Sequence, residues 1–155
     1  MESSSSSPEQ ALLEEVRRRR AQLRESMSAV EHALAAPAPG VQARWTDGVR
    51  VALIELSTDF GTHIDVTEGS DGLYRELLRT APRLSGAVAR LTSEHAVIKD
   101  LLDNLIACVS EPDITTDVDR VRDRGTALLG TLVRHRQHGS DLIYEAYTAD
   151  IGGET

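Results

Sequence analysis

Apolar residues recur three or four positions apart through four long segments of this chain. In the first segment the series is Leu13, Val16, Leu23, Met27, Val30 and Leu34. Such spacing places the apolar side chains on one face of an α-helix. Only 3% of the residues are aromatic and β-branched runs are absent, which disfavours a sheet. Four amphipathic helices must bury their stripes against one another, so we predict an all-α protein, an up-down-up-down four-helix bundle.

Cap and turn residues separate the four predicted helices. Ser7-Pro8-Glu9-Gln10 has the form of a capping box with proline at the first helical position. Pro82 is expected to kink the third helix or to divide it, and Thr116 with Asp117 offers a cap for the fourth. The expected helices cover residues 8–36, 41–68, 73–109 and 117–150. We therefore predict a disordered tail over 1–7 and one bundle domain over 8–150.

Charge and cysteine content limit the partners and the compartment. The formal net charge of −8 argues against a nucleic-acid or anionic-membrane partner. The chain has no signal peptide and no apolar run of membrane-spanning length, so we expect a cytoplasmic protein, and its excess of arginine over lysine is typical of a GC-rich bacterial genome. Cys108 is the single cysteine and is expected to be a small buried hydrophobe. The charge run of Arg17, Arg18 and Arg19 predicts a solvated helix face.

Three histidines interrupt the apolar stripes. His63, His95 and His135 each occupy a stripe position, on three different predicted helices. A polar ring on a core-facing stripe needs a partner, and three such rings converging inside a bundle favour a metal ion. The other two histidines give weaker signals: His32 lies off its stripe and is expected at the surface, and His138 beside its stripe is expected to be exposed or half-buried.

These residues carry a resemblance to a known family. The segments Trp45…His63…Glu68, Glu94-His95-Ala-Val-Ile98 and Leu132-Val-Arg-His135 resemble those of the hemerythrin-like (HHE cation-binding) domain, over about 12–147 of the chain. The resemblance implies a four-helix bundle that holds two irons bridged by carboxylates. It also implies a role in binding dioxygen or nitric oxide, in redox response or in iron handling.

Three positions depart from the family pattern. The resemblance implies a histidine on the first helix, where Arg20 stands here. It also implies carboxylates one turn after the histidines of the second and fourth helices, where Thr67 and Gly139 stand. The nearest carboxylates are those of Glu68 and Asp141. At about 100° per residue, they face the metal only if a π-bulge or local unwinding turns them inward.

Two functions follow from this pattern. In the first, His63, His95 and His135 hold one iron or zinc, with Glu68 as fourth and Asp141 as fifth ligand. Two irons bind if both carboxylates bridge, and an open position takes a small molecule such as dioxygen or nitric oxide.

In the second, the bundle is metal-free and acts as a regulatory or protein-interaction module, as a homodimer or with another protein. Arg20 then replaces the missing cation and pairs with Glu68 or Asp141; alternatively, its side chain extends outward to solvent. A third possibility is an oxygenase or peroxidase-like enzyme on the same site, but nothing in the chain specifies a substrate, and it has no glycine-rich phosphate loop and no catalytic triad.

Overall fold

The computed structural model describes residues 7–40, 42–111 and 117–152, and these residues form helices and no strand. The prediction of an all-α protein is confirmed, and four long helices pack together. The elements are α1 (Pro8–Ala35), α2 (Gln42–Glu68), α3 (Leu73–Thr80), the short 3-10 helix η1 (Pro82–Leu84), α4 (Ser85–Ser110) and α5 (Val118–Gly152). Within the described ranges, no helix combines the length and the apolarity that crossing a membrane requires.

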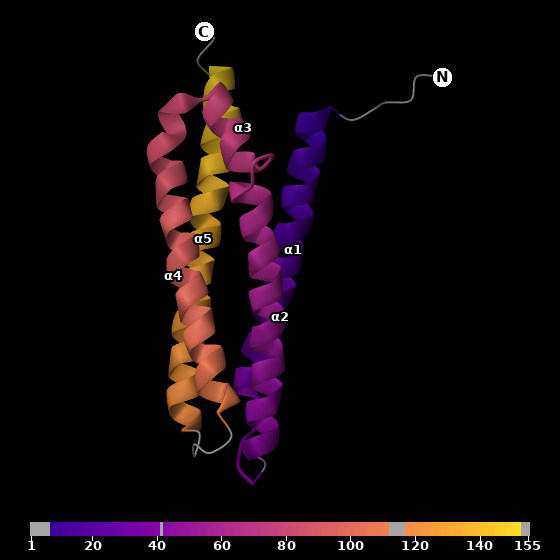
Figure 1. The fold of residues 1–155 in the computed structure, drawn as a ribbon, viewed down its shortest axis with the longest axis vertical. Coiled ribbons are helices and arrows are strands. Elements are labelled where there is room, and N and C mark those ends of the chain that lie inside the picture. The colour runs from indigo at the N-terminus through magenta and orange to yellow at the C-terminus, as the bar shows by residue number, and fades with distance from the viewer. Residues whose placement is uncertain (1–6, 41, 112–116, 153–155) are drawn as a thin grey trace, which may run out of the picture.

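Each long helix packs against two others. α1 contacts α2, α2 contacts α4, α4 contacts α5, and α5 returns to α1. In Figure 1, α1 begins and α5 ends at the upper end of the view, where the short α3 also lies. This closed ring of contacts gives the four stripes one shared interior.

The predicted caps at Ser7 and Asp117 are present at the starts of α1 and α5. Ser7 caps α1: its Oγ accepts from the backbone N of Gln10 at 3.2 Å, and Gln10 Oε1 accepts from the backbone N of Ser7 at 3.1 Å. Asp117 caps α5, because its Oδ1 accepts from the backbone N of Arg120 at 3.2 Å. Residues 1–6 of the predicted disordered tail, and Thr116 of the predicted cap, lie outside the described residues.

Pro82 divides the third predicted helix rather than bending it. α3 ends at Thr80, η1 makes a single turn from Pro82, and α4 begins at Ser85. Proline has no backbone N–H to donate to the preceding turn and its ring clashes with that turn, so it kinks or breaks an α-helix, and here the helix breaks. The division leaves α3 as a short element that packs on α2 and α1.

The core consists of two apolar clusters. The larger includes Leu53, Leu56, Phe60 and Leu132 and extends along all four long helices. The smaller gathers under α3 and η1 and includes Val16, Leu73, Leu77, Leu84, Leu91 and Leu142. The three stripe histidines belong to neither cluster, and along their helices they stand where one cluster gives way to the other. A polar layer therefore divides the core.

Most side chains outside this layer lie as the stripes predict. His32 is exposed and His138 is half-buried, as expected. Cys108 corrects the prediction, because it is half-buried rather than buried. It lies beside the buried face that runs through Leu105 and Val109, not on it.

Candidate metal centre

His63 on α2, His95 on α4 and His135 on α5 meet inside the bundle. These residues are only 5%, 1% and 3% exposed, respectively. Each offers one ring nitrogen, and these nitrogens lie within 4.8 Å of one another. The Nε2 atoms of His63 and His135 are 3.4 Å apart. The structure thus brings together the three histidines that the apolar stripes single out.

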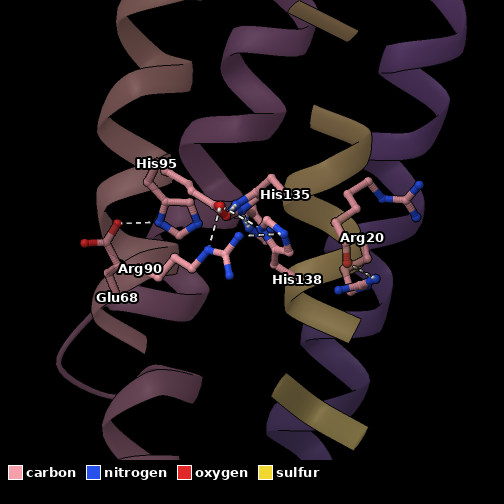
Figure 2. Close-up of polar contacts among 9 residues, drawn as sticks. Arg20, Glu68, Arg90, His95, His135 and His138 are labelled. Carbon is pink, nitrogen blue, oxygen red and sulfur yellow. Dashed lines mark hydrogen bonds and ion pairs between the residues drawn. The ribbon is translucent and has the colours of Figure 1, made fainter. Parts of the chain in front are cut away.

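Two glutamates orient two of the rings. His95 Nδ1 donates to Glu68 Oε2 at 2.5 Å, and His135 Nδ1 donates to Glu94 Oε1 at 2.8 Å. Figure 2 shows the Glu68–His95 contact at the left and His135 at the centre. An ionised carboxylate can only accept, so it fixes the ring proton on Nδ1 and leaves a lone pair on Nε2. Metal-binding histidines typically make this contact through the nitrogen that faces away from the ion.

Two ring nitrogens in this layer are buried without a partner. They are His95 Nε2 and His63 Nδ1, and neither has a hydrogen bond among the described residues. A buried polar atom left unpaired costs about 1–3 kcal/mol. A cation on the lone pair of His95 Nε2 would remove that cost, and the nearby Nε2 atoms could share the same cation.

All three rings are held in the neutral state that metal binding requires. Burial, followed by the other two histidines and then by Arg20 and Arg136, lowers the pKa of His63 to about 3. Burial also lowers the pKa of His95 and of His135, although Glu68 and Glu94 oppose that shift.

Glu94 also joins His135 to a polar chain that reaches the surface. Its Oε2 accepts from His138 Nδ1 at 2.7 Å, and Arg90 donates to His138 Nε2 at 3.1 Å. Burial raises the pKa of Glu94, but the hydrogen bonds from His135 and His138 outweigh it and lower that pKa. Sequence reasoning missed this role for Glu94. The available signal was a pair of histidines three residues apart, which share a helix side that a carboxylate on a facing helix can reach.

The two carboxylates that were predicted as ligands take different positions. Glu68, the last residue of α2, contacts His95 rather than the centre that the three rings share. Asp141 is exposed, and its Oδ1 accepts from Gln137 Nε2 at 2.9 Å. α5 continues as an α-helix through Gly139 and Ser140, so no unwinding turns Asp141 inward. The structure therefore does not bring Asp141 to the histidines.

Arg20 corrects a second expectation. Its guanidinium donates to Ser140 Oγ at 2.6 Å and to the carbonyl of Arg136 at 3.3 Å. It pairs with neither Glu68 nor Asp141, and Figure 2 shows it apart from Glu68 and His95. The side chain is half-buried against α5 and does not extend freely into solvent.

The departures at positions 20 and 139 are one structural feature. A Cβ atom on Gly139 would lie only 3.1 Å from the Nη1 atom of Arg20. The missing side chain lets the guanidinium lie against the backbone of α5, where it finds its carbonyl partner.

A small cavity adjoins His63 and His135. Its volume is about 20 Å³, and its walls include Arg20, Thr67 and Tyr74. About 10–15 Å³ by this measure is enough for one water, so the cavity fits a water or a diatomic molecule. Tyr74 stacks on His95 with ring centres 5.8 Å apart, and burial raises its pKa, which keeps the phenol protonated. Phe60 packs against all three imidazoles from within the larger cluster.

The residues present do not fit a carboxylate-bridged pair of irons. Bridging needs carboxylate oxygens between the two ions, whereas Glu68 and Glu94 accept hydrogen bonds from ring Nδ1 atoms. The three ring nitrogens could hold a single ion, since all of them lie within 4.8 Å of one another. Zinc–nitrogen bonds of about 2.0–2.1 Å in a tetrahedral site place two nitrogens roughly 3.3–3.4 Å apart. The His63–His135 separation of 3.4 Å has that length.

Comparison with known proteins adds no family to this description. No family model, no curated protein and no solved structure matches the chain.

Proposed function

We propose that this chain is a hemerythrin-like, up-down-up-down bundle that binds one divalent transition-metal ion through His63, His95 and His135. The buried, unpartnered Nε2 of His95 carries the proposal, because it faces a second and a third imidazole. Contacts from Glu68 and Glu94 to the ring Nδ1 atoms support it.

The donor set bears on the identity of the metal. Imidazole suits zinc, iron, copper and nickel, whereas iron pairs usually require carboxylate ligands. Three neutral nitrogens favour zinc, while the family resemblance favours iron. Both metals accept three protein ligands with a further position open.

The open position defines what the centre would do. A bound metal supplies a Lewis-acidic site for a small molecule, and the cavity of about 20 Å³ beside His63 admits nothing larger than a water or a diatomic. We propose a ligand of the size of dioxygen or nitric oxide and no enzymatic reaction. The protein's own part is to hold the ring protons on Nδ1 and, through Phe60 and Tyr74, to keep bulk water away.

Metal analysis tests the proposal. Protein from cells grown with added zinc and iron should contain about one ion per chain, and a chelator should lower its melting temperature. His95→Ala should abolish both effects, whereas the exposed His32→Ala should change neither. Substoichiometric metal together with a chelator-insensitive melting temperature would overturn metal binding.

That negative outcome would favour a second candidate, a metal-free interaction module. Its supporting observation is that His63 and His135 lie within hydrogen-bond distance of each other without an ion between them. Exposed apolar residues offer a surface for a second copy or another protein; they are Val51 and Ile54 on α2 and Val97 and Leu101 on α4. Sedimentation of the chelator-treated protein would then show a dimer that Val51→Lys disrupts.

A further inference from the structure

Four arginines line one surface pocket between α1 and α5. Arg17, Arg20 and Arg24 are spaced three and four residues apart on α1, and Arg136 faces them from α5. The pocket has a volume of about 550 Å³, and Glu25 is the one acidic residue in its lining. Four positive charges and a single negative charge therefore share one small space on a chain whose formal net charge is −8.

The protein does not neutralise these charges itself. The adjacent arginines show the contrast, since Arg18 and Arg19 both form ion pairs with Glu15, at 2.5 Å and 2.7 Å. Within the described part of the chain, none of the pocket arginines has an ion pair. Arg20 donates only to a hydroxyl and a carbonyl, which leave its charge uncompensated.

Arg20, Arg24 and Arg136 also act on one another. Burial and then Arg136 lower the pKa of Arg20, and burial and then Arg24 lower the pKa of Arg136. The Nε of Arg136 is buried and has no hydrogen-bond partner among the described residues. Repulsion and an unpaired donor both make this arrangement unfavourable, unless an anion binds.

We propose that this pocket binds a small phosphate compound with at least two negative charges. Guanidinium groups match phosphate oxygens with two parallel hydrogen bonds each. Arg17 and Arg24 are exposed and can move to the ligand, while Arg20 is held against α5 by its hydrogen bonds and Arg136 is half-buried. The negative charge of the rest of the chain disfavours a nucleic-acid backbone as the occupant.

A neighbouring pocket indicates what the phosphate carries. It measures about 410 Å³, shares Arg17 and Arg20 with the first, and is otherwise mainly apolar, including Leu13, Ile143 and Tyr147. An apolar or aromatic group attached to the phosphate fits there, so the ligand class is an organic phosphate ester. Arg20 and Arg136 also line the cavity beside His63 and His135, but none of the pocket residues is a proposed metal ligand, so anion binding does not require the metal.

Calorimetric titration of the full chain tests the site, with inorganic phosphate and phenyl phosphate as probes and with a chelator present throughout. Both probes should bind once per chain, phenyl phosphate more tightly. Arg17→Gln/Arg24→Gln should weaken binding at least about tenfold, since it removes two guanidinium groups that would donate charged hydrogen bonds to the phosphate. The matched control Arg18→Gln/Arg19→Gln removes two charges from the same helix and should leave binding unchanged.

Three outcomes would overturn the proposal or a part of it. If the two double variants lost affinity equally, the effect would come from the overall charge of the helix and not from this pocket. Binding that does not saturate would exclude a specific site. Equal affinity for the two probes would remove the apolar extension. Because the titration is done with chelator, failure of the metal proposal would not affect these results, and both double variants should keep the metal content of the unaltered chain.

Discussion

The two apolar clusters of the core differ in how they are closed. The larger one is formed by all four long helices, and Leu53, Leu56 and Leu132 in it are fully buried. The smaller one depends on α3, an element of eight residues that Pro82 separates from α4. The histidine layer lies between them. The comparison indicates that the larger cluster is the main source of the stability of the fold. The histidine layer, which lies between it and the smaller cluster, can therefore contain polar groups.

The largest effect should come from the larger cluster. Leu56→Ala removes a fully buried side chain and should lower the free energy of unfolding by about 2–5 kcal/mol. Urea denaturation measures this loss, and Val51→Ala, at a position 61% exposed on the same helix, should change it by less than about 0.5 kcal/mol. Metal content should stay the same in both variants. Loss of the metal in folded Leu56→Ala protein would show that the two regions are not independent.

Lowering the pH should reduce the stability of the fold through the histidine layer rather than through the apolar clusters. The pKa of His63 falls from 6.5 in the unfolded chain to about 3 in the fold. Below pH 6.5 the unfolded chain therefore binds a proton that the folded chain does not, and stability falls by about 1.4 kcal/mol per pH unit until pH nears 3. Above pH 6.5 the His63 ring is neutral in both the folded and the unfolded chain, so it causes no loss of stability there and no pH dependence.

Chelator-treated protein, unfolded in urea from pH 7 to pH 4.5, shows this dependence. His63→Gln should make the decline shallower by about 1.4 kcal/mol per pH unit, whereas exposed His32→Gln should not. The same slope in all three proteins would mean that the His63 ring is protonated in the folded state.

The glutamates behind the rings should have a smaller effect, on metal affinity. Glu94→Gln keeps an oxygen that can accept from His135 Nδ1 but loses the charge, and should weaken metal binding about 10–100-fold. Competition against a metal-binding dye measures the affinity, with exposed Glu55→Gln on α2 as the matched control. An unchanged affinity for Glu94→Gln would remove that carboxylate from the proposed centre.

The helices and the burial of the three histidines could be predicted from the sequence, because both follow from the local spacing of apolar residues. His63, His95 and His135 lie on the stripes that the periodicity defines, and burial follows from the stripe. The partners of those rings could not be predicted in this way. Whether Glu94 reaches His135 depends on how α4 is rotated against α5, and a stripe sets that rotation only to within a neighbouring residue or so.

The same limit applies to the remaining polar residues. Asp141 could be a ligand only if a local distortion of α5 turned it inward, but that helix stays regular and the carboxylate stays outside. For Arg20 the sequence left open an acidic partner, Glu68 or Asp141, or a side chain that extends outward to solvent. The structure gives it neutral acceptors on α5, beside position 139, where a Cβ atom would lie only 3.1 Å from Arg20 Nη1.

The smallest predicted effect concerns that contact. Alanine in place of glycine within a helix raises the free energy of unfolding by about 0.5–1 kcal/mol when its Cβ atom has room. Gly130 has that room, since the nearest atom to its Cβ would be Arg134 Nη1 at 3.6 Å. At Gly139 the Cβ would lie 3.1 Å from Arg20 Nη1, so the guanidinium must shift and its hydrogen bonds to α5 weaken.

Gly130→Ala should therefore stabilise the chain by the full amount, and Gly139→Ala by less or not at all. Urea unfolding of Arg20→Gln/Gly139→Ala completes a double-mutant cycle. With the guanidinium gone, alanine at 139 should recover the stabilisation seen at 130. Additive effects of the two changes would mean that Arg20 and Gly139 contribute independently to stability.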